Sequence, residues 1–262
     1  MPLHCPVWTN PPLASEASTP RLQIWRVRLG DLDGDPLDTL RPLTVPSEHR
    51  RARRYEFDAD RRRHLAGRAL VRLVLSRHYG RAPRDLSITE GPHGKPRLPD
   101  VPDGDPTLHF NIAHTDDVVV AAFSRTHPVG IDVEPLNREV DVEALAERVL
   151  TDTERQRWRA LPAARRRDVF LHLWTCKEAF LKATGQGLQR ASDTIECRFE
   201  GNMVAALDDA EAYTPQTSNT AAARWAVRAF SASEGIAGAI VHRHEPPLSP
   251  VWTDASPLLN QR

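Results

Sequence analysis

The chain has 262 residues, and its 35 Lys and Arg balance its 35 Asp and Glu, so the formal net charge is zero. A neutral chain with 6% aromatic residues lacks the continuous basic face and interleaved aromatics that are typical of a nucleic-acid binder. No stretch approaches the ~18 consecutive apolar residues of a membrane-spanning helix. The length and the 40% hydrophobic content predict one large globular domain or two small ones.

The three cysteines, Cys5, Cys176 and Cys197, are far apart, are odd in number and form no C-x-x-C pair. This usage argues against a disulfide framework and predicts a reducing, cytoplasmic compartment. Residues 1–20 are rich in Pro, Ser and Thr and lack the apolar core of a signal peptide. They are predicted to be a disordered leader, and residues 246–262 a flexible tail.

Two series of elements follow one another along the chain. The first series is a strand at 22–29, a helix from 46, a helix at 63–79 before Gly80, a short strand at 86–89, and a hairpin of 108–112 with 118–123. The second series is a strand at 129–133, helices at 142–149 and 168–183, and strands at 194–199, 225–230 and 237–241. In each series an arginine run precedes an amphipathic helix, a glycine and about three short strands.

This repetition predicts an α+β pseudo-dimer of two similar halves, each a small, mostly antiparallel sheet packed on a long helix. The halves are expected at residues 21–125 and 126–245, with a functional site in the cleft between them. A chance match of common elements is the alternative. The arginine runs, at 50–54, 61–63 and 165–167, suggest local anion sites, because the guanidinium fork suits phosphate. Ordinary solvated helix faces would explain each single run equally well.

A pair of acidic residues ends the strand Val-Gly-Ile-Asp-Val-Glu, at Asp132 and Glu134. Because side chains alternate along a strand, these two carboxylates share one face, about 7 Å apart, while Ile131 and Val133 point to the other. Two such carboxylates could chelate a hard cation. An exposed strand edge with two solvated acids is the simpler interpretation.

A second candidate segment is the helix over residues 170–182. Trp174, Glu178 and Lys182 are spaced i, i+4, i+8 and therefore line one face beside the apolar stripe. The carboxylate could bind a metal while the lysine contacts a phosphate. An ordinary Glu178–Lys182 salt bridge, worth about 0.2–0.5 kcal/mol, is the alternative.

Two weaker signals lie in the first half. His114 ends a strand in Phe-Asn-Ile-Ala-His-Thr and could donate to a phosphate oxygen. In Gly94-Lys95-Pro96, glycine lets backbone amides approach an anion and lysine adds a point charge. Either segment alone is a common turn or loop feature.

The order of the four segments is more specific than any one of them. G-K-P, then F-N-x-x-H, then G-I-D-V-E, then W-T-x-K-E-A-F-x-K resembles the 4′-phosphopantetheinyl transferase superfamily, and best its two-domain, surfactin-synthetase-activating type. The resemblance covers roughly residues 46–188.

The resemblance implies a Mg²⁺ ion held by Asp132, Glu134 and Glu178, with coenzyme A as co-substrate. It implies that Asp132, Glu178 and Lys182 are catalytic and also contact the cofactor. By the same similarity, cofactor phosphates are expected to be bound by Gly94, Lys95, Asn111, His114 and Thr115, and the 3′-phosphate by Arg51 and Arg63.

The implied reaction transfers the phosphopantetheine arm of coenzyme A to a serine of an apo acyl or peptidyl carrier protein, releasing 3′,5′-ADP. Glu178 or a metal-bound water would be the base. The partner is expected to be acidic and helical, docking near residues 148–167, and the transferase to be a monomer with no nucleic-acid or membrane partner. Which carriers and which pathway, fatty acid, polyketide or nonribosomal peptide, stay open.

One departure from the family pattern is that Ala113 and Thr115 flank the histidine, where serines are usual. A backbone amide can still donate at position 113, but a hydroxyl donor is lost. The departure therefore bears on one phosphate hydrogen bond, worth about 1.5–3 kcal/mol if charge-assisted, and not on the reaction. Two rival functions use the same residues. A metal-dependent phosphohydrolase would cleave coenzyme A without a carrier, and a binding module would have lost its metal.

Overall fold

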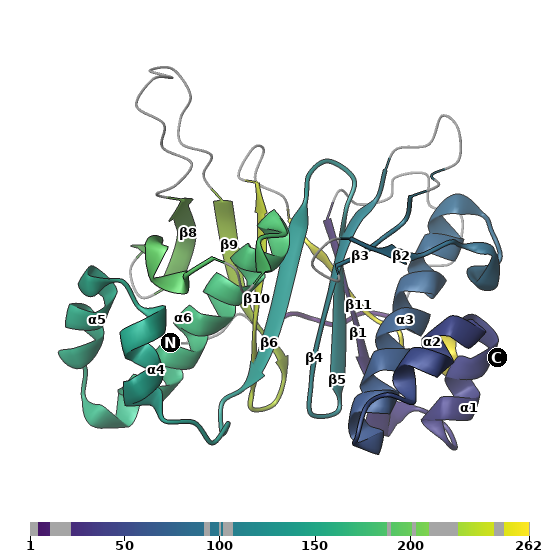
Figure 1. Ribbon diagram of the computed structural model, residues 1–262, viewed down its shortest axis with the longest axis horizontal. Coiled ribbons are helices and arrows are strands. Elements are labelled where there is room, and N and C mark those ends of the chain that lie inside the picture. Colours follow the sequence, from purple (N-terminus) through teal and green to yellow (C-terminus); the bar gives the residue numbers. More distant parts are fainter. Residues whose placement is uncertain are drawn as a thin grey trace. The chain divides into compact units, whose positions relative to one another are not determined.

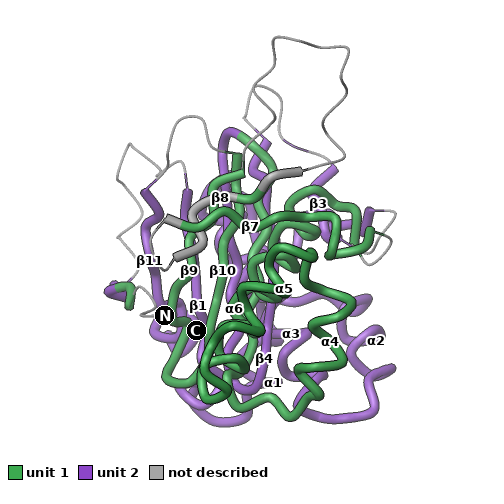
Figure 2. Tube along the Cα trace, turned by 90° about the vertical axis from the view of Figure 1, so that its left-hand side faces the viewer, with its two compact units in different colours: residues 1–6, 127–248 green, residues 7–126, 249–262 purple. Residues whose placement is uncertain are grey.

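The computed structural model describes residues 5–10, 22–91, 95–99, 101, 107–187, 190–200, 203–209, 225–243 and 249–261. The chain divides into two compact units, coloured separately in Figure 2. Unit 1 comprises residues 1–6 and 127–248, and unit 2 comprises residues 7–126 and 249–262. Each unit therefore combines a long central segment with a short piece from one end of the chain. No described helix is long and apolar enough to cross a membrane.

Unit 2 consists of short elements around one long helix. Its elements are β1 (Leu22–Arg28), η1 (Leu29–Asp31), α1 (Pro36–Leu40), η2 (Arg41–Leu43), α2 (Pro46–Ala52), α3 (Asp58–Tyr79), η3 (Pro83–Asp85), β2 (Thr89–Glu90), β3 (Pro96–Arg97), β4 (His109–Thr115), β5 (Val118–Ser124), β11 (Val251–Asp254) and α7 (Ser256–Asn260).

The main sheet of unit 2 has the strand order β11-β1-β5-β4. β4 and β5 form the predicted antiparallel hairpin, and β5 pairs antiparallel with β1. Helix α3 packs on β1, β4 and β5, with Leu65, Leu70 and Leu73 almost fully buried. It ends at Gly80, whose φ of 65° is the left-handed C-cap conformation that glycine adopts at no steric cost.

The expected flexible tail is wrong for residues 251–260. β11 pairs parallel with β1, from Gln23↔Val251 to Arg26↔Asp254, and α7 follows it. The expected disordered leader is likewise wrong at Thr9, which bridges to Thr253 on the other side of β11. The Arg26 guanidinium joins these pieces by pairing with Asp254 at 2.5 Å and lying 4.3 Å from the centre of the Trp8 ring.

Unit 1 also consists of short elements around one long helix, which packs on two strands that are distant from each other in the sequence. Its elements are β6 (Val129–Pro135), α4 (Val142–Val149), α5 (Asp152–Arg159), α6 (Ala163–Thr184), η5 (Ser192–Thr194), β7 (Ile195–Glu200), β8 (Met203–Asp209), β9 (Trp225–Ser233) and β10 (Ile236–Arg243).

The sheet of unit 1 is antiparallel, with the order β6-β10-β9-β8-β7. Helix α6 lies across β6 and β10 (Figure 1) and buries Phe170, Leu173, Phe180 and Leu181, the predicted apolar stripe. Like α3, it has 22 residues and ends at a left-handed glycine, Gly185. The two units therefore share one design, and the predicted α+β class with a small, mostly antiparallel sheet on a long helix is confirmed.

Gly130 allows α6 to approach β6 closely. A Cβ atom at this position would lie 1.9 Å from the Ala179 carbonyl oxygen and 2.4 Å from the Ala183 amide nitrogen. Both are backbone atoms of α6, so relief requires the whole helix to move. Glycine at position 130 therefore sets how closely α6 meets β6.

Gly130→Ala should lower the free energy of unfolding by about 3 kcal/mol, because the added methyl overpacks a backbone contact. Gly67→Ala on α3 is the matched control, since the nearest neighbours of its new Cβ would be side-chain methyl groups, of Ile112 at 3.2 Å and of Val119 at 3.7 Å. Helix propensity offsets that contact, so the control should change stability by less than about 1 kcal/mol. Urea denaturation of both variants makes the comparison, and equal losses would contradict this account.

Candidate active site

The strand β6 turns its two carboxylates toward α6. Gly130, Asp132 and Glu134 share one face by strand alternation, and Gly130 lies directly against the backbone of α6. Ile131 and Val133 are buried on the opposite face, 0% and 2% exposed. The predicted sharing of one face is therefore confirmed, and it is the face that packs against the helix.

Asp132 is the most buried acid of this group, 6% exposed. Its Oδ1 accepts a hydrogen bond from Lys182 Nζ at 2.6 Å, whereas its Oδ2 is buried without a partner. Burial raises the pKa of Asp132, and the ammonium of Lys182 opposes that rise. Lys182 thus reaches from α6 to a strand residue 50 positions away in the sequence.

Glu134 and Glu178 complete a group of three acids. Glu134 accepts a hydrogen bond from Arg138 at 2.6 Å, and burial followed by the charge of Asp132 raises its pKa. Burial and then Asp132 likewise raise the pKa of Glu178, with Glu134 adding to the effect. Asp132 therefore acts electrostatically on both glutamates, and Glu134 acts on Glu178. That the three acids serve one site stays a prediction.

The side chains of this group do not converge on one point. Within the described part of the chain, no three His, Cys, Asp or Glu side chains form a group that could hold a metal ion as they lie. Asp132 and Glu134 instead each bond to a basic side chain, Lys182 and Arg138. The oxygen chemistry of three acids suits a hard cation, and the unpartnered Asp132 Oδ2 is a ready ligand atom.

Trp174 supports this region by packing. Its ring meets Phe170 edge to face at 5.6 Å, and the Arg138 guanidinium lies 5.3 Å from the centre of the ring. Arg138 therefore contacts both Glu134 and Trp174. The expected role of Trp174, fixing the helix rather than taking part in chemistry, stays a prediction that these contacts favour.

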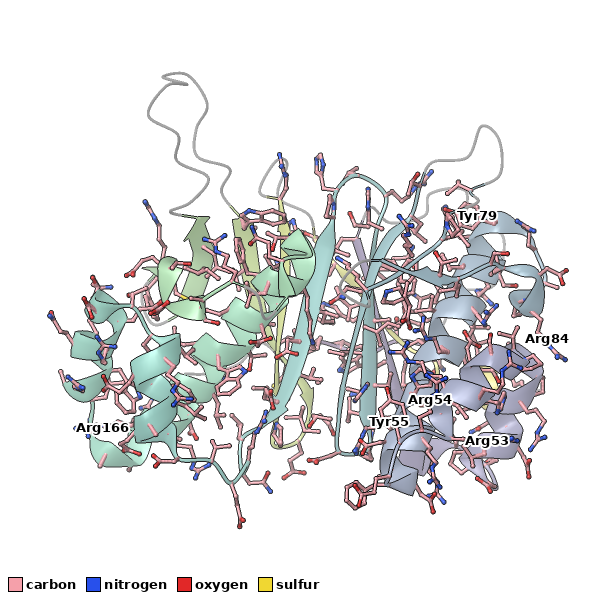
Figure 3. All side chains as sticks on the ribbon, in the orientation of Figure 1. Arg53, Arg54, Tyr55, Tyr79, Arg84 and Arg166 are labelled. Atoms are coloured by element: carbon pink, nitrogen blue, oxygen red, sulfur yellow. The ribbon has the colours of Figure 1, made fainter. Side chains whose placement is uncertain are left out.

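A second group of polar residues lies in unit 2, around α2, α3 and β2. Glu90 bonds both Arg51 and Arg68, the latter at 2.8 Å. Burial and the charges of Arg68, Arg51 and His114 lower the pKa of His64 to about 4, so its ring is neutral at pH 7. The Tyr55 ring packs 5.4 Å from it, in the α2–α3 connection that carries Arg53 and Arg54 (Figure 3).

Strand alternation separates the predicted residues of β4. His114 shares a face with Phe110 and Ile112, which pack with α3, and it acts electrostatically on His64 of that helix. Asn111 and Thr115 belong to the opposite face of β4. Ala113 lies on that opposite face as well and is 4% exposed. His114 therefore acts on His64 from the face of β4 opposite to that of Asn111 and Thr115.

The remaining predicted residues are scattered. Arg63 donates to the Asp116 carbonyl oxygen at 2.8 Å and to Asp60 at 2.6 Å, in contacts separate from the Glu90 group. Lys95 precedes β3, and burial lowers its pKa to about 8. Gly94 lies outside the described residues.

Several residues of these groups carry no motif that would have singled them out. Arg68 and His64 are at i, i+4 spacing on α3, and Arg138 follows Glu134 by four, which is a weak signal of contact at best. Glu90 lies far from Arg51 in the sequence, and only the fold joins them. Gly130 belongs to a recognisable motif, but its steric role depends on where α6 lies.

Comparison with known proteins decides the family. Residues 128–227 match the model of the 4′-phosphopantetheinyl transferase superfamily, and residues 37–126 match that of the 4′-phosphopantetheinyl transferase N-terminal domain. The chain is 32% identical to the 4′-phosphopantetheinyl transferase HetI of a Nostoc species, over 79% of this chain and 86% of HetI. It belongs to the 4′-phosphopantetheinyl transferase superfamily.

Two further transferases of the superfamily show similar relationships. The 4′-phosphopantetheinyl transferase Sfp of Bacillus subtilis is 33% identical, over 65% of this chain and 73% of Sfp. A putative 4′-phosphopantetheinyl transferase of a Synechocystis species is 34% identical, over 64% of this chain and 67% of its own length. The boundary between the two family matches, at residues 126–128, coincides with the division between unit 2 and unit 1.

Proposed function

We propose that this member of the 4′-phosphopantetheinyl transferase superfamily transfers the 4′-phosphopantetheine group of coenzyme A to a serine of an apo carrier protein. The observation that carries the proposal is the meeting of four motif residues in unit 1. Asp132 and Glu134 on β6 interact with Glu178 on α6, and Lys182 bonds Asp132 at 2.6 Å. These residues come from the two motifs that are most specific to the superfamily.

The reaction is a phosphoryl transfer. The serine oxygen forms a bond to the β-phosphorus of coenzyme A, the bond from that phosphorus to the bridging oxygen breaks, and 3′,5′-ADP leaves. The serine proton passes to Glu178 or to a water in the site. The work of the protein is positioning and charge neutralisation.

A Mg²⁺ ion is proposed as the metal, with Asp132, Glu134 and Glu178 as its protein ligands. Their carboxylates have the hard oxygen chemistry that Mg²⁺ requires. When bound, Mg²⁺ would neutralise and orient the diphosphate. Asp132 and Glu134 would exchange their bonds to Lys182 and Arg138 for this ion.

Basic residues are proposed to bind the phosphates of coenzyme A. Lys182 is 32% exposed at its side chain and can supply charge to the diphosphate. Lys95 and His114 are assigned to phosphate contacts and Arg51 to the 3′-phosphate, while Gly94, Asn111, Thr115 and Arg63 remain weaker candidates. Acidic, helical carrier domains are the proposed partners, docking near residues 148–167. The reducing cytosol is the proposed compartment, which agrees with the free thiols of Cys5, Cys176 and Cys197. A monomer is the proposed working form, because the internal duplication supplies two similar halves in one chain.

Release of 3′,5′-ADP distinguishes transfer from hydrolysis. With coenzyme A and Mg²⁺, the transferase should release 3′,5′-ADP only when apo carrier is present, in a 1:1 ratio to holo carrier formed. The same release without a carrier would favour a phosphohydrolase. Binding of coenzyme A without any release, across several carriers, would favour a binding module.

The lowered pKa of Lys95 predicts a pH dependence of coenzyme A use. Because burial brings its pKa to about 8, the ammonium is charged at pH 7 and is lost as the pH rises through 8. Losing that charge weakens phosphate binding, so kcat/KM for coenzyme A should fall above pH 8. Lys95→Arg keeps its charge and should flatten the profile between pH 7 and 9. An unchanged profile in this variant would contradict the assignment.

A further inference from the structure

Lys177, one residue before Glu178, has no exposed surface and forms a complete set of bonds. Its ammonium donates to Glu154 Oε2 at 2.5 Å, to the Val149 carbonyl oxygen at 2.7 Å and to the Ser192 carbonyl oxygen at 3.1 Å. An ammonium has three hydrogens, so these three acceptors satisfy it fully.

Glu154 is equally buried, and it extends the network to two more segments. Its Oε1 accepts from the Cys197 amide at 2.8 Å, and its Oε2 accepts from the Thr151 amide at 2.9 Å. Thr151 and Glu154 form the capping box of α5, while Cys197 lies in β7. One ion pair therefore joins the end of α4, the start of α5, η5, β7 and α6.

Stability alone is a weak reason for such a pair. Removing two charges from water is costly, and a protein with apolar residues of similar volume in their place is often as stable or more stable. The pair can instead define a geometry, because an ammonium with three fixed acceptors restricts rotation of the helix that carries it. Lys177 lies on α6 directly before Glu178, so the rotation in question is the one that moves the Glu178 carboxylate.

The helix α6 is held on two sides of Glu178. Ala179 rests against Gly130 of β6, and Lys177, two residues earlier, lies about 200° around the helix from Ala179. Glu178 lies between these two contacts. A carboxylate about 6 Å from the helix axis moves by about 1 Å when the helix rotates by about 10°. A misplacement of about 1 Å can cost about a hundredfold in rate.

We propose that Lys177 and Glu154 are positioning residues that fix the rotation of α6 and so aim the carboxylate of Glu178. The proposal rests on the proposed function, in which Glu178 acts at the reacting phosphate. It assigns no contact with substrate to Lys177, which is fully buried. The pair acts only through Glu178.

The double variant Lys177→Met/Glu154→Gln tests this role, because it removes both charges while keeping the side-chain volumes similar. Turnover is measured at a temperature where circular dichroism shows the variant to be folded. We expect kcat to fall at least tenfold, with the KM for the carrier unchanged. Wild-type kcat in the folded double variant would overturn the proposal.

The matched control is a second buried ion pair, Arg72–Glu48 in unit 2, with side chains 2% and 9% exposed. Arg72→Met/Glu48→Gln should lower the melting temperature to a similar extent and leave kcat within about twofold, since this pair joins α2 to α3 in unit 2, whereas Glu178 belongs to α6 of unit 1. Equal kcat losses in both double variants would show a general stability effect and overturn the proposal. If the Lys177 double variant does not fold, Glu154→Gln alone replaces it, because glutamine keeps the side-chain shape and one acceptor oxygen. This single variant should lower kcat about fivefold. A wild-type kcat in Glu154→Gln would overturn the proposal.

A cycle with Glu178→Gln separates this proposal from the function beneath it. In the Glu178→Gln background, the pair variant should lower the residual kcat by less than twofold, because its effect passes through that carboxylate. Full additivity would contradict positioning. If Glu178→Gln itself kept wild-type kcat, the proposed role of Glu178 would fail. A wild-type kcat in the Lys177/Glu154 double variant, together with an inactive Glu178→Gln variant, would refute the positioning role and leave the proposed function intact.

Discussion

Asp132→Ala is expected to lower Mg²⁺-dependent turnover by about a thousandfold, the largest effect of any single substitution in the chain. The change removes a proposed metal ligand and the bonding partner of Lys182. Initial rates of holo carrier formation, measured over a range of Mg²⁺ concentrations, give the comparison. Glu143→Ala, an exposed acid on α4, is the control and should leave turnover unchanged.

The same substitution should not destabilise the fold. Burial raises the pKa of Asp132, so the ionised carboxylate lowers the stability of the folded state. In addition, its Oδ2 is buried without a hydrogen-bond partner. Lys182 is partly exposed and can turn to water when Asp132 is removed. The free energy of unfolding should therefore stay within about 1 kcal/mol or increase, as is common where function has been kept at a cost in stability. A variant that unfolds, or one that keeps its activity, would contradict the assignment of Asp132.

Arg51→Ala is expected to raise the KM for coenzyme A by about 10- to 100-fold, because the substitution removes one or two charge-assisted hydrogen bonds to the 3′-phosphate. The KM for 3′-dephospho-coenzyme A, which lacks the 3′-phosphate, should change little. Arg51 shares Glu90 with Arg68 beside His64, in a concentrated basic region that an added phosphate could enter by displacing Glu90. Competition between the two cofactors in one assay gives the ratio directly.

Arg63→Ala is the matched control for that prediction. Both arginines were candidates for the 3′-phosphate, but Arg63 bonds Asp60 and the Asp116 carbonyl instead of joining the Glu90 group. Its removal should change the KM for coenzyme A by less than about threefold. A larger effect at Arg63 than at Arg51 would reverse the assignment of the two residues.

Local periodicity was sufficient to predict the orientation of the candidate site. The two-residue repeat of β6 correctly put Asp132 and Glu134 on one face, and the helical repeat of α6 put Trp174, Glu178 and Lys182 on one partly exposed stripe. Both are properties of a single element. The hairpin of β4 with β5 was accessible for the same reason, because its strands are separated by a short turn.

Contacts between distant segments could not be predicted in this way. Lys182 was expected beside Glu178 on its own helix, yet it reaches Asp132 on β6, a contact that exists only because Gly130 lets the helix approach. β11 pairs with a strand more than two hundred residues away, and its short sequence after a proline gives little local signal. β8 was missed altogether. For Lys177 the sequence shows only membership of a motif, since nothing in its neighbours indicates that Glu154 lies against it.

The central claim is tested most directly by weighing the carrier. The transferase is incubated with coenzyme A, Mg²⁺ and each of several apo carriers, from fatty acid, polyketide and nonribosomal peptide synthesis, and the intact carriers are analysed by mass spectrometry. At least one carrier should gain the mass of a single phosphopantetheine group, and it should not do so when its acceptor serine is replaced by alanine. No gain on any carrier, with a known transferase modifying the same samples, would contradict the assigned function.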